Sequence, residues 1–500
     1  MSRSVRLLPA LLGCLALTAT ATGFVPPGRG SGPGPGRPVP ADGGPRSAGG
    51  AFVLPGTGRY EPDRTPAAAS YTVALTGDAS GGEWSGHEAV SFTNVSAEPL
   101  HEVHLRLWGN AHGGCSKPAV TVTDLVGAAE DAPASGPAPA SAPASGPVAG
   151  LSADCTVLRV VLPAPLGPGG HHTIGFDLTI RAPELTDSAD RFGRHGAYSY
   201  FGNALPVLAV RDADGWHLGP YTDTGESFYT LAADFSVVLD HPAGLGVPAT
   251  GGSTDAPGAD GRTVTTATAR QVRDFAWAAG PFGTVSGRSG GGTAITVHTT
   301  AGIRAADARA MLAVAERAVD AHSRAFGAYP YAELDAVLDG DLWFSGMEYP
   351  GFVLDRVNRT ALTHEVAHQW WYGIVGDDQY GRPWLDESFS EYATDLALGR
   401  DGAGCWSGVA WSSPQERITN GMAYWDEHRD RYGTVVYDYG ACALHDLRRL
   451  LGADVMEGLL RGYAREHWYG VSSTPAFKAA AQAAAAEDLA PFWAAHRIDG

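Results

Sequence analysis

The chain has 500 residues, of which 44% are hydrophobic and 18% are charged, and its formal net charge is −19. This composition is that of a globular chain long enough for two or three domains, and it excludes a fibrous or wholly disordered protein. An acidic surface repels phosphate backbones, so we expect no nucleic-acid partner.

An export signal is predicted at the N-terminus. Arg3 and Arg6 precede an apolar stretch, and Ala19-Thr20-Ala21 has the small residues that a signal peptidase cuts after, so residues 1–21 are predicted to be a signal peptide. The segment Leu11-Leu12-Gly13-Cys14 also resembles a lipobox, and lipidation of Cys14 is the weaker alternative. No later apolar run reaches the length of about 18 residues that a membrane-spanning helix needs. The chain is therefore predicted to be secreted or otherwise extracytoplasmic.

Export makes disulfide bonds possible for the cysteines that follow the signal. They are Cys115, Cys155, Cys405 and Cys442, two on each side of the domain boundary predicted below. This distribution favours the pairs Cys115–Cys155 and Cys405–Cys442, although the sequence alone allows three connectivities.

Short strands dominate the first half of the chain. Residues 22–52 are rich in Gly and Pro and are predicted to be a linker. Alternating apolar residues between turns then predict an antiparallel β domain over 53–288. A Pro/Ala/Ser-rich insert at 127–150 is predicted to be a disordered surface loop. The predicted strands cover 70–75, 101–107, 156–162, 173–180, 235–239 and 264–269.

Helical patterns dominate the second half, residues 289–500. A strand at 294–298 leads into an alanine-rich helix at 305–326, which Gly327 ends. The fold class is therefore multidomain, with a β domain followed by a mainly helical α+β domain. The further predicted helices cover 361–375, 384–398, 434–451, 453–466 and 475–486.

A motif of two histidines and a glutamate carries the chemistry. In His364-Glu365-Val366-Ala367-His368, the histidines stand four positions apart, so on a helix they project from one face and can share a zinc ion. Glu365 lies beside the metal without binding it, where it can act as general base on a water molecule. The alternative is two histidines that merely pack on a helix.

A third ligand follows in the next predicted helix. Glu387 lies 19 positions after His368, and two His with one Glu leave a fourth coordination position for water, as a catalytic zinc site requires. Glu391, one turn later, either fixes a ligand histidine by a hydrogen bond or simply faces solvent.

These residues resemble the aminopeptidase N family of zinc peptidases, a family of gluzincins. The resemblance rests on His-Glu-x-x-His, on Glu387 within Trp384-Leu385-Asp386-Glu387-Ser388-Phe389, and on Ser345-Gly346-Met347-Glu348-Tyr349-Pro350. It covers roughly residues 60–500 and is strongest from about 328 to 445. The resemblance implies a saddle-like N-terminal β domain, a thermolysin-like catalytic domain, one Zn²⁺ per chain and peptide substrates with a free N-terminus.

The same resemblance implies roles for further residues. Glu348 would bind the substrate's α-amine, and a carboxylate pairs well with an ammonium group; Gly346 and Met347 would line the same site. Tyr437, in a segment similar to the family's Tyr-x-Lys-Gly-Ala, would donate a hydrogen bond to the oxyanion. Tyr439 stands where the family usually has lysine.

The chain also departs from the family pattern. The family usually has a second amine-binding acid in the β domain, and no Glu stands in the segment 200–206. Tyr349 replaces the usual Asn of the exopeptidase motif. The sequence ends at Gly500 without the family's large helical C-terminal domain, so we expect a short bacterial form with a more open site.

The preferred function is a zinc-dependent aminopeptidase in which Glu365 is the general base and Tyr437 stabilises the oxyanion. The alternatives are a secreted zinc endopeptidase on the same fold and a non-catalytic scaffold. Substrates with a blocked N-terminus separate the first two, because the Glu348 clamp has nothing to bind on them. The sequence does not predict the substrate's side chain or the oligomeric state.

Overall fold

The computed structural model describes residues 64–129, 150–185, 191–342 and 344–499. The predicted signal peptide and linker, and most of the predicted insert at 127–150, lie outside these residues. Residues Leu54–Gly500 form one compact unit. In the part of the chain that is described, no helix combines the length and apolar character needed to cross a membrane.

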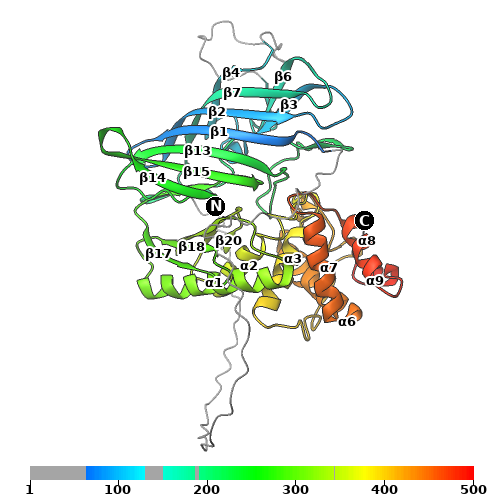
Figure 1. The fold of residues 1–500 in the computed structure, drawn as a ribbon. Coiled ribbons are helices and arrows are strands. Elements are labelled where there is room, and N and C mark those ends of the chain that lie inside the picture. The colour runs from blue at the N-terminus through cyan, green and yellow to red at the C-terminus, as the bar shows by residue number, and fades with distance from the viewer. Residues whose placement is uncertain (1–63, 130–149, 186–190, 343, 500) are drawn as a thin grey trace, which may run out of the picture. The chain divides into compact units, whose positions relative to one another are not determined.

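A seven-stranded sheet dominates the N-terminal region (Figure 1). Along β1 (Ala67–Gly77), Tyr71, Val73 and Leu75 are buried while Thr72 and Thr76 are exposed, as the alternation of a one-sided sheet requires. Neighbouring strands are antiparallel except β1 and β13, which run parallel. The sheet order is β14 (Gly252–Pro257), β15 (Arg262–Val272), β13 (Ala233–Pro242), β1, β2 (Glu83–Thr93), β7 (His171–Arg181) and β4 (Val120–Val126).

Smaller sheets cover the buried face of this sheet. Three aromatic rings meet in the shared core: Phe201 stacks on Trp277 with ring centroids 4.6 Å apart, and Trp84 packs edge-on against Trp277. Each of the six strands predicted in this region overlaps an observed strand. The smaller sheets are β10 (Val207–Leu208), β3 (Leu100–Arg106), β6 (Val157–Leu166) and β5 (Leu151–Ser152); β16 (Trp277–Ala279), β9 (Tyr198–Phe201) and β8 (Phe192–His195); and β11 (Arg211–Asp212) with β12 (Gly215–Trp216).

A second, five-stranded sheet begins the second half of the chain. Its order is β17 (Gly283–Arg288), β18 (Ala294–Thr299), β19 (Glu333–Leu338), β21 (Phe352–Asp355) and β20 (Gly346–Met347), and β18, β19 and β21 are parallel. Helix α1 (Ala305–Phe326) buries Met311, Val314 and Ala318 in the core that also holds Ile295 of β18. The predicted strand at 294–298 and helix at 305–326 are confirmed. The predicted boundary near residue 288 falls at the end of β17 and stays a prediction.

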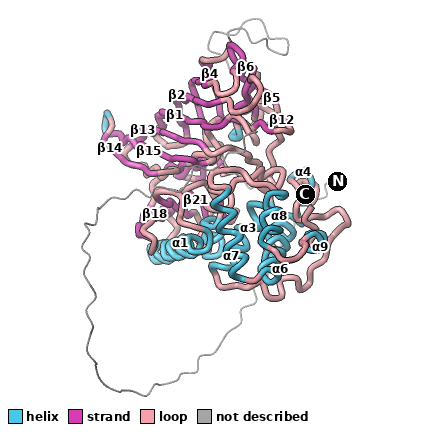
Figure 2. The backbone as a smooth tube through the Cα atoms, turned by 45° about the vertical axis from the view of Figure 1, so that its right-hand side comes forward, coloured by secondary structure: helices cyan, strands magenta, loops and turns pink. Residues whose placement is uncertain are grey.

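Helices make up most of the remainder (Figure 2). The prediction of one helix over 361–375 was too long: α2 (Arg359–Ala367) ends at Ala367, and further along Tyr372 has a φ of 133°, far from the helical value of about −63°. The region 434–451 is a π-helical turn, η3 (Gly433–Tyr439), followed by α6 (Gly440–Leu451). The others are α3 (Trp384–Ala397), α4 (Met422–Trp425), α5 (Arg429–Tyr432), α7 (Ala453–Glu466), α8 (Thr474–Ala484) and α9 (Ala490–Ala495).

One buried arginine joins the strand-rich region to the helical one. Arg273, which follows β15, is 2% exposed and donates to the carbonyl oxygens of Thr230 at 3.0 Å and Tyr372 at 2.6 Å. It also donates to the carbonyls of Ile374 and Gly470. The carbonyls of Tyr372 and Ile374 thus point to the guanidinium and do not bond along a continued helix.

The structure contains both favoured disulfide bonds. Cys115 is bonded to Cys155 in the strand-rich region, and Cys405 is bonded to Cys442 of α6. Each bond therefore lies within one half of the chain, as the distribution of the cysteines predicted.

Candidate active site

Helix α2 presents two histidines on one face. Its N-terminus is capped by Asn358, whose side-chain oxygen accepts from the backbone N–H groups of Thr360 at 2.9 Å and Ala361 at 3.2 Å. The Nε2 atoms of His364 and His368 lie 2.9 Å apart, and both side chains are buried. The spacing of four positions thus brings the two imidazoles together as expected.

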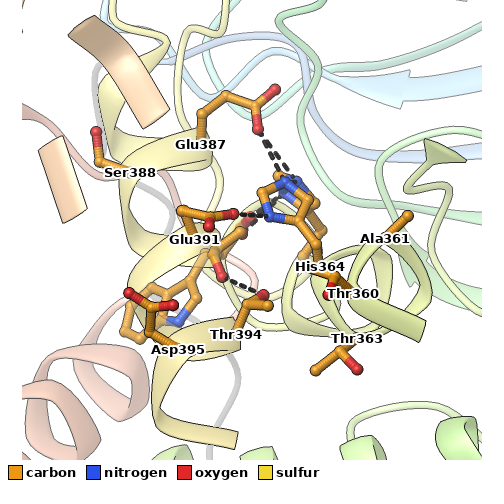
Figure 3. Close-up of polar contacts among 12 residues, drawn as sticks. Thr360, Ala361, Thr363, His364, Glu387, Ser388, Glu391, Thr394 and Asp395 are labelled. Atoms are coloured by element: carbon orange, nitrogen blue, oxygen red, sulfur yellow. Dashed lines mark hydrogen bonds and ion pairs between the residues drawn. The ribbon is translucent and has the colours of Figure 1, made fainter. Parts of the chain in front are cut away.

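Glu387 of α3 completes a three-ligand cluster. Its Oε2 atom lies 3.2 Å from His364 Nε2 and 3.4 Å from His368 Nε2 (Figure 3). Zinc bonds of about 2.0–2.1 Å in tetrahedral geometry place neighbouring ligand atoms about 3.3 Å apart. The three donor atoms therefore have the chemistry and the spacing of a zinc site with one position left for water or substrate.

Acidic side chains contact the Nδ1 atom of each histidine and thereby orient its ring. Glu391 lies one turn after Glu387, and its Oε2 atom is 3.1 Å from His364 Nδ1 (Figure 3). The Oδ1 atom of Asp386 is 2.5 Å from His368 Nδ1, and both of these side chains are 1% exposed. A histidine that donates from Nδ1 to a carboxylate leaves the lone pair of Nε2 free for a metal. The structure thus favours the orienting role for Glu391 over the solvent-facing one.

Glu365 lies beside the cluster in a tight environment. It is 4% exposed, and burial raises its pKa to about 7, against the opposing effect of His364 and His368. A Cβ atom on Gly346 would lie 2.2 Å from Glu365 Oε1, so only glycine at this position leaves the carboxylate its place. A carboxyl group with a pKa near neutrality suits a general base.

Tyr437 approaches the cluster from the π-helical turn η3. Its ring stacks on that of His364 with centroids 5.7 Å apart, and its hydroxyl forms a hydrogen bond with Glu387. Burial and the Glu387 charge raise the pKa of Tyr437 well above its usual value, so the phenol stays protonated and can donate. Turns of π-helix are frequent at functional sites.

Two residues fix the position of this turn. Ser388 Oγ donates to the carbonyl of Val436 at 2.6 Å, so α3 holds η3 through the residue that follows Glu387. A Cβ atom on Gly440 would lie only 1.9 Å from Ser388 Oγ, so the absence of a side chain at Gly440 permits this close packing.

The edge strand β20 brings the predicted substrate-binding residues to the same place. Met347 is 1% exposed, and Glu348, which follows it, is 3% exposed. Burial raises the pKa of Glu348 well above its usual range, and repulsion from Glu226 adds to this shift. Gln379 donates to Glu348 Oε1 at 3.1 Å.

Glu226 is an acid that the sequence analysis did not identify. It lies between β12 and β13, outside the segment 200–206 in which a second acid was sought. Burial raises its pKa to about 7, although its ion pair with Arg191 opposes the shift. Neither a motif nor a spacing marks this residue, because only the folded chain brings it next to Glu348.

One cavity of about 510 Å³ unites these groups. It is lined by the three candidate ligands and by Glu365, Tyr437, Gly346, Met347, Glu348 and Glu226. Every site residue predicted from the sequence therefore lines a single pocket, together with the carboxylate of Glu226. Such a pocket can hold a cationic group and a metal at the same time.

Comparisons with known proteins point to one family. Residues 311–496 match the Peptidase family M1 domain. The chain is 26% identical over 243 residues to Aminopeptidase M1 of Arabidopsis thaliana, covering 42% of this chain and 27% of that protein. It is 26% identical over 120 residues to human Endoplasmic reticulum aminopeptidase 1, covering 22% of this chain and 13% of that protein. The chain thus spans about a quarter or less of the length of these relatives.

Solved structures resemble the fold over most of the chain. The M1 zinc metallopeptidase from Deinococcus radiodurans superposes with a TM-score of 0.60 at 18% identity, covering 90% of this chain and 96% of that one. A mutant of a two-domain M1 zinc metallopeptidase bound to L-arginine gives a TM-score of 0.62 at 18% identity, covering 88% and 94%. The predicted fold class, a β domain followed by a mainly helical α+β domain, is confirmed by these structures. Residues 311–496 thus match the domain of Peptidase family M1, and the fold of the chain resembles that of M1 zinc metallopeptidases.

Proposed function

We propose that this protein is a zinc-dependent aminopeptidase that removes N-terminal residues from peptides. The observation that carries the proposal is the single cavity in which Glu348 and Glu226 face the cluster of His364, His368 and Glu387. Two buried carboxylates beside a metal site suit a substrate whose free α-ammonium group lies next to the bond to be cleaved.

Each residue of the site has a distinct role in the proposed reaction. Glu348 and Glu226 bind the α-ammonium group and thereby place the first peptide bond next to the metal ligands. A zinc ion held by the three ligands would polarise the scissile carbonyl and lower the pKa of water. Glu365 takes the proton of the attacking water and passes it to the leaving amine. Tyr437 donates a hydrogen bond to the oxygen on which negative charge develops.

The matched test compares substrates with and without a free N-terminus. Aminoacyl-coumarin amides and their Nα-acetyl forms are offered to the full chain, with and without a zinc chelator. We expect cleavage of the free-amine substrates alone, its loss with the chelator and its return with added Zn²⁺. Metal analysis should give one zinc per chain.

Other outcomes point to other functions. Equal cleavage of acetylated substrates contradicts the amine clamp and indicates an endopeptidase. Absence of cleavage from a chain that holds one zinc indicates a scaffold. The variant Glu365→Gln separates catalysis from folding, because it removes the base and leaves the three candidate ligands in place; we expect its activity to fall by about 10²- to 10⁴-fold with zinc retained.

We also propose that the protein works outside the cytoplasm. The two disulfide bonds support this, since such bonds persist in oxidising compartments. Fractionation of the producing cells tests it: recovery of the full-length chain with reduced thiols from the cytoplasm would contradict the proposal, whereas a chain shortened after Ala21 and found outside it is expected.

A further inference from the structure

Gln379 lies at the centre of the candidate site without touching the metal ligands. It follows α2 in the loop that leads to α3, and its side chain is fully buried. Its backbone N–H donates to the carbonyl of Phe228 at 3.1 Å, which ties this loop to the segment that carries Glu226. The backbone bond itself does not require a glutamine, so the side chain calls for a separate explanation.

The side-chain amide of Gln379 bridges two carboxylates. Its Nε2 atom lies 3.1 Å from Glu348 Oε1 and 2.6 Å from Asp386 Oδ2. An amide nitrogen carries two hydrogens, so it can donate one to each acid. Asp386 in turn contacts Nδ1 of His368. A continuous chain of polar contacts thus runs from Glu348 through Gln379 and Asp386 to His368.

Among the described residues, the side chain of Gln379 makes its hydrogen bonds through Nε2 and not through Oε1. No protein group among the described residues donates to Gln379 Oε1, although the atom is buried. Burying a polar atom in this way costs about 1–3 kcal/mol. A neighbouring buried glutamine differs: Gln369 accepts from the N–H of Gly351 at 2.7 Å and donates only to backbone carbonyls.

We propose that Gln379 is a positioning residue. Its amide holds the carboxylate of Glu348 in place for the substrate's α-ammonium group and, through Asp386, fixes the position of that carboxylate relative to His368. This inference rests on the proposed aminopeptidase function. Without the amide, the acids of Glu348 and Asp386 would face each other across an apolar gap, and their mutual repulsion would turn Glu348 away from the substrate. The contribution of the amine to binding would then fall, while the metal would still bind.

The test measures the contribution of the amine without relying on turnover. Leucine hydroxamate and 4-methylpentanoyl hydroxamate share a metal-binding group and a side chain, and only the first has an α-amine. The ratio of their inhibition constants is measured on the zinc-loaded full chain and on Q379M, which removes the amide and keeps the volume. We expect the ratio to be about tenfold smaller in Q379M, as for one charge-assisted hydrogen bond.

Two controls separate positioning from simple destabilisation. Thr474→Val removes the acceptor of a 2.8 Å bond from Trp384 Nε1, so it weakens the start of α3 without touching a carboxylate, and the ratio should not change. In an E348Q background, Q379M should cause no further fall, because the effect acts through Glu348. Should Q379M not fold, Q379N gives the same test, since its amide is one methylene too short.

Each result decides a different question. A ratio near one in the wild-type protein contradicts the amine clamp itself, and with it the proposed function. A wild-type ratio well above one that Q379M or Q379N leaves unchanged contradicts the role of Gln379 alone. A fall that persists at full size in the E348Q background also contradicts it, since Gln379 would then act by another route.

Discussion

The contact between Gly440 and Ser388 allows a sharp test of how Tyr437 is held. In Gly440→Ala, the new Cβ would lie 1.9 Å from Ser388 Oγ and 2.5 Å from Ser388 Cβ. Carbon atoms pack at about 3.5–4.0 Å, so η3 and α3 must separate by about 1 Å. A misplacement of about 1 Å in a catalytic site costs on the order of 10²-fold in rate. We therefore expect the kcat on a free-amine substrate to fall by about 10²-fold.

The effect on stability should be smaller than the effect on rate. Overpacking of a core costs about 1–3 kcal/mol, whereas replacing a helical glycine by alanine recovers about 1 kcal/mol. The free energy of unfolding, measured in urea, should therefore fall by about 0–2 kcal/mol, and the variant should remain folded.

Two further variants make the test decisive. The double variant Ser388→Gly/Gly440→Ala removes the obstructing side chain and should recover part of the kcat, because it also removes the hydrogen bond from Ser388 to the Val436 carbonyl. Gly458→Ala in α7 is the matched control, because a Cβ there meets no atom within 4 Å, and its kcat should equal that of the wild-type protein. A wild-type kcat in Gly440→Ala would refute the reasoning that this contact sets the position of Tyr437.

Three other predictions concern titration and the metal. Burial raises the pKa of Asp274 to about 7, so between pH 4 and pH 7 the folded chain keeps a proton that the unfolded chain loses. The free energy of unfolding should therefore fall by up to about 4 kcal/mol over this range and then level off. Asp274→Asn should flatten this pH dependence, as measured by urea titrations at pH 5 and pH 8. An equal pH dependence in the variant would contradict the assignment. Because Glu226 must be ionised to bind an ammonium group, kcat/KM for free-amine substrates should rise as the pH passes about 7, and Glu226→Gln should lower its plateau; a flat profile from pH 5.5 to 8 would count against this role. Asp386→Ala and Glu391→Ala each remove the carboxylate that contacts Nδ1 of one histidine. Each variant should bind zinc about 10- to 100-fold more weakly in a chelator competition. Unchanged zinc affinity in both variants would show that these acids do not orient the ligands.

The parts of the site that sequence predicted are those that depend on local geometry. The spacing of His364 and His368 on one helix determines that their rings meet, and Glu387 opens the next helix. Glu226 and Gln379 were not found, because their roles depend on contacts between segments far apart in the chain. No periodicity records such contacts.

The fold shows the same division. Helix α1 was predicted with its observed ends, since its apolar stripe and Gly327 are local signals. The end of α2 was misjudged because the residues after Ala367 retain a helical pattern while a distant arginine draws the carbonyls of Tyr372 and Ile374 out of it. Tertiary contacts here outweigh the local preference.

That arginine also limits how the molecule can be divided. The acceptors of Arg273 come from Thr230 on one side and from Tyr372, Ile374 and Gly470 on the other. A fragment that began near residue 289 would leave three of these carbonyls without their common donor, and the space beside Gly376, where a Cβ would lie 1.9 Å from the guanidinium carbon, would stand empty. The second half of the chain therefore depends on an arginine of the first half, and a shortened variant of this protein has to include Arg273 to keep these carbonyls paired.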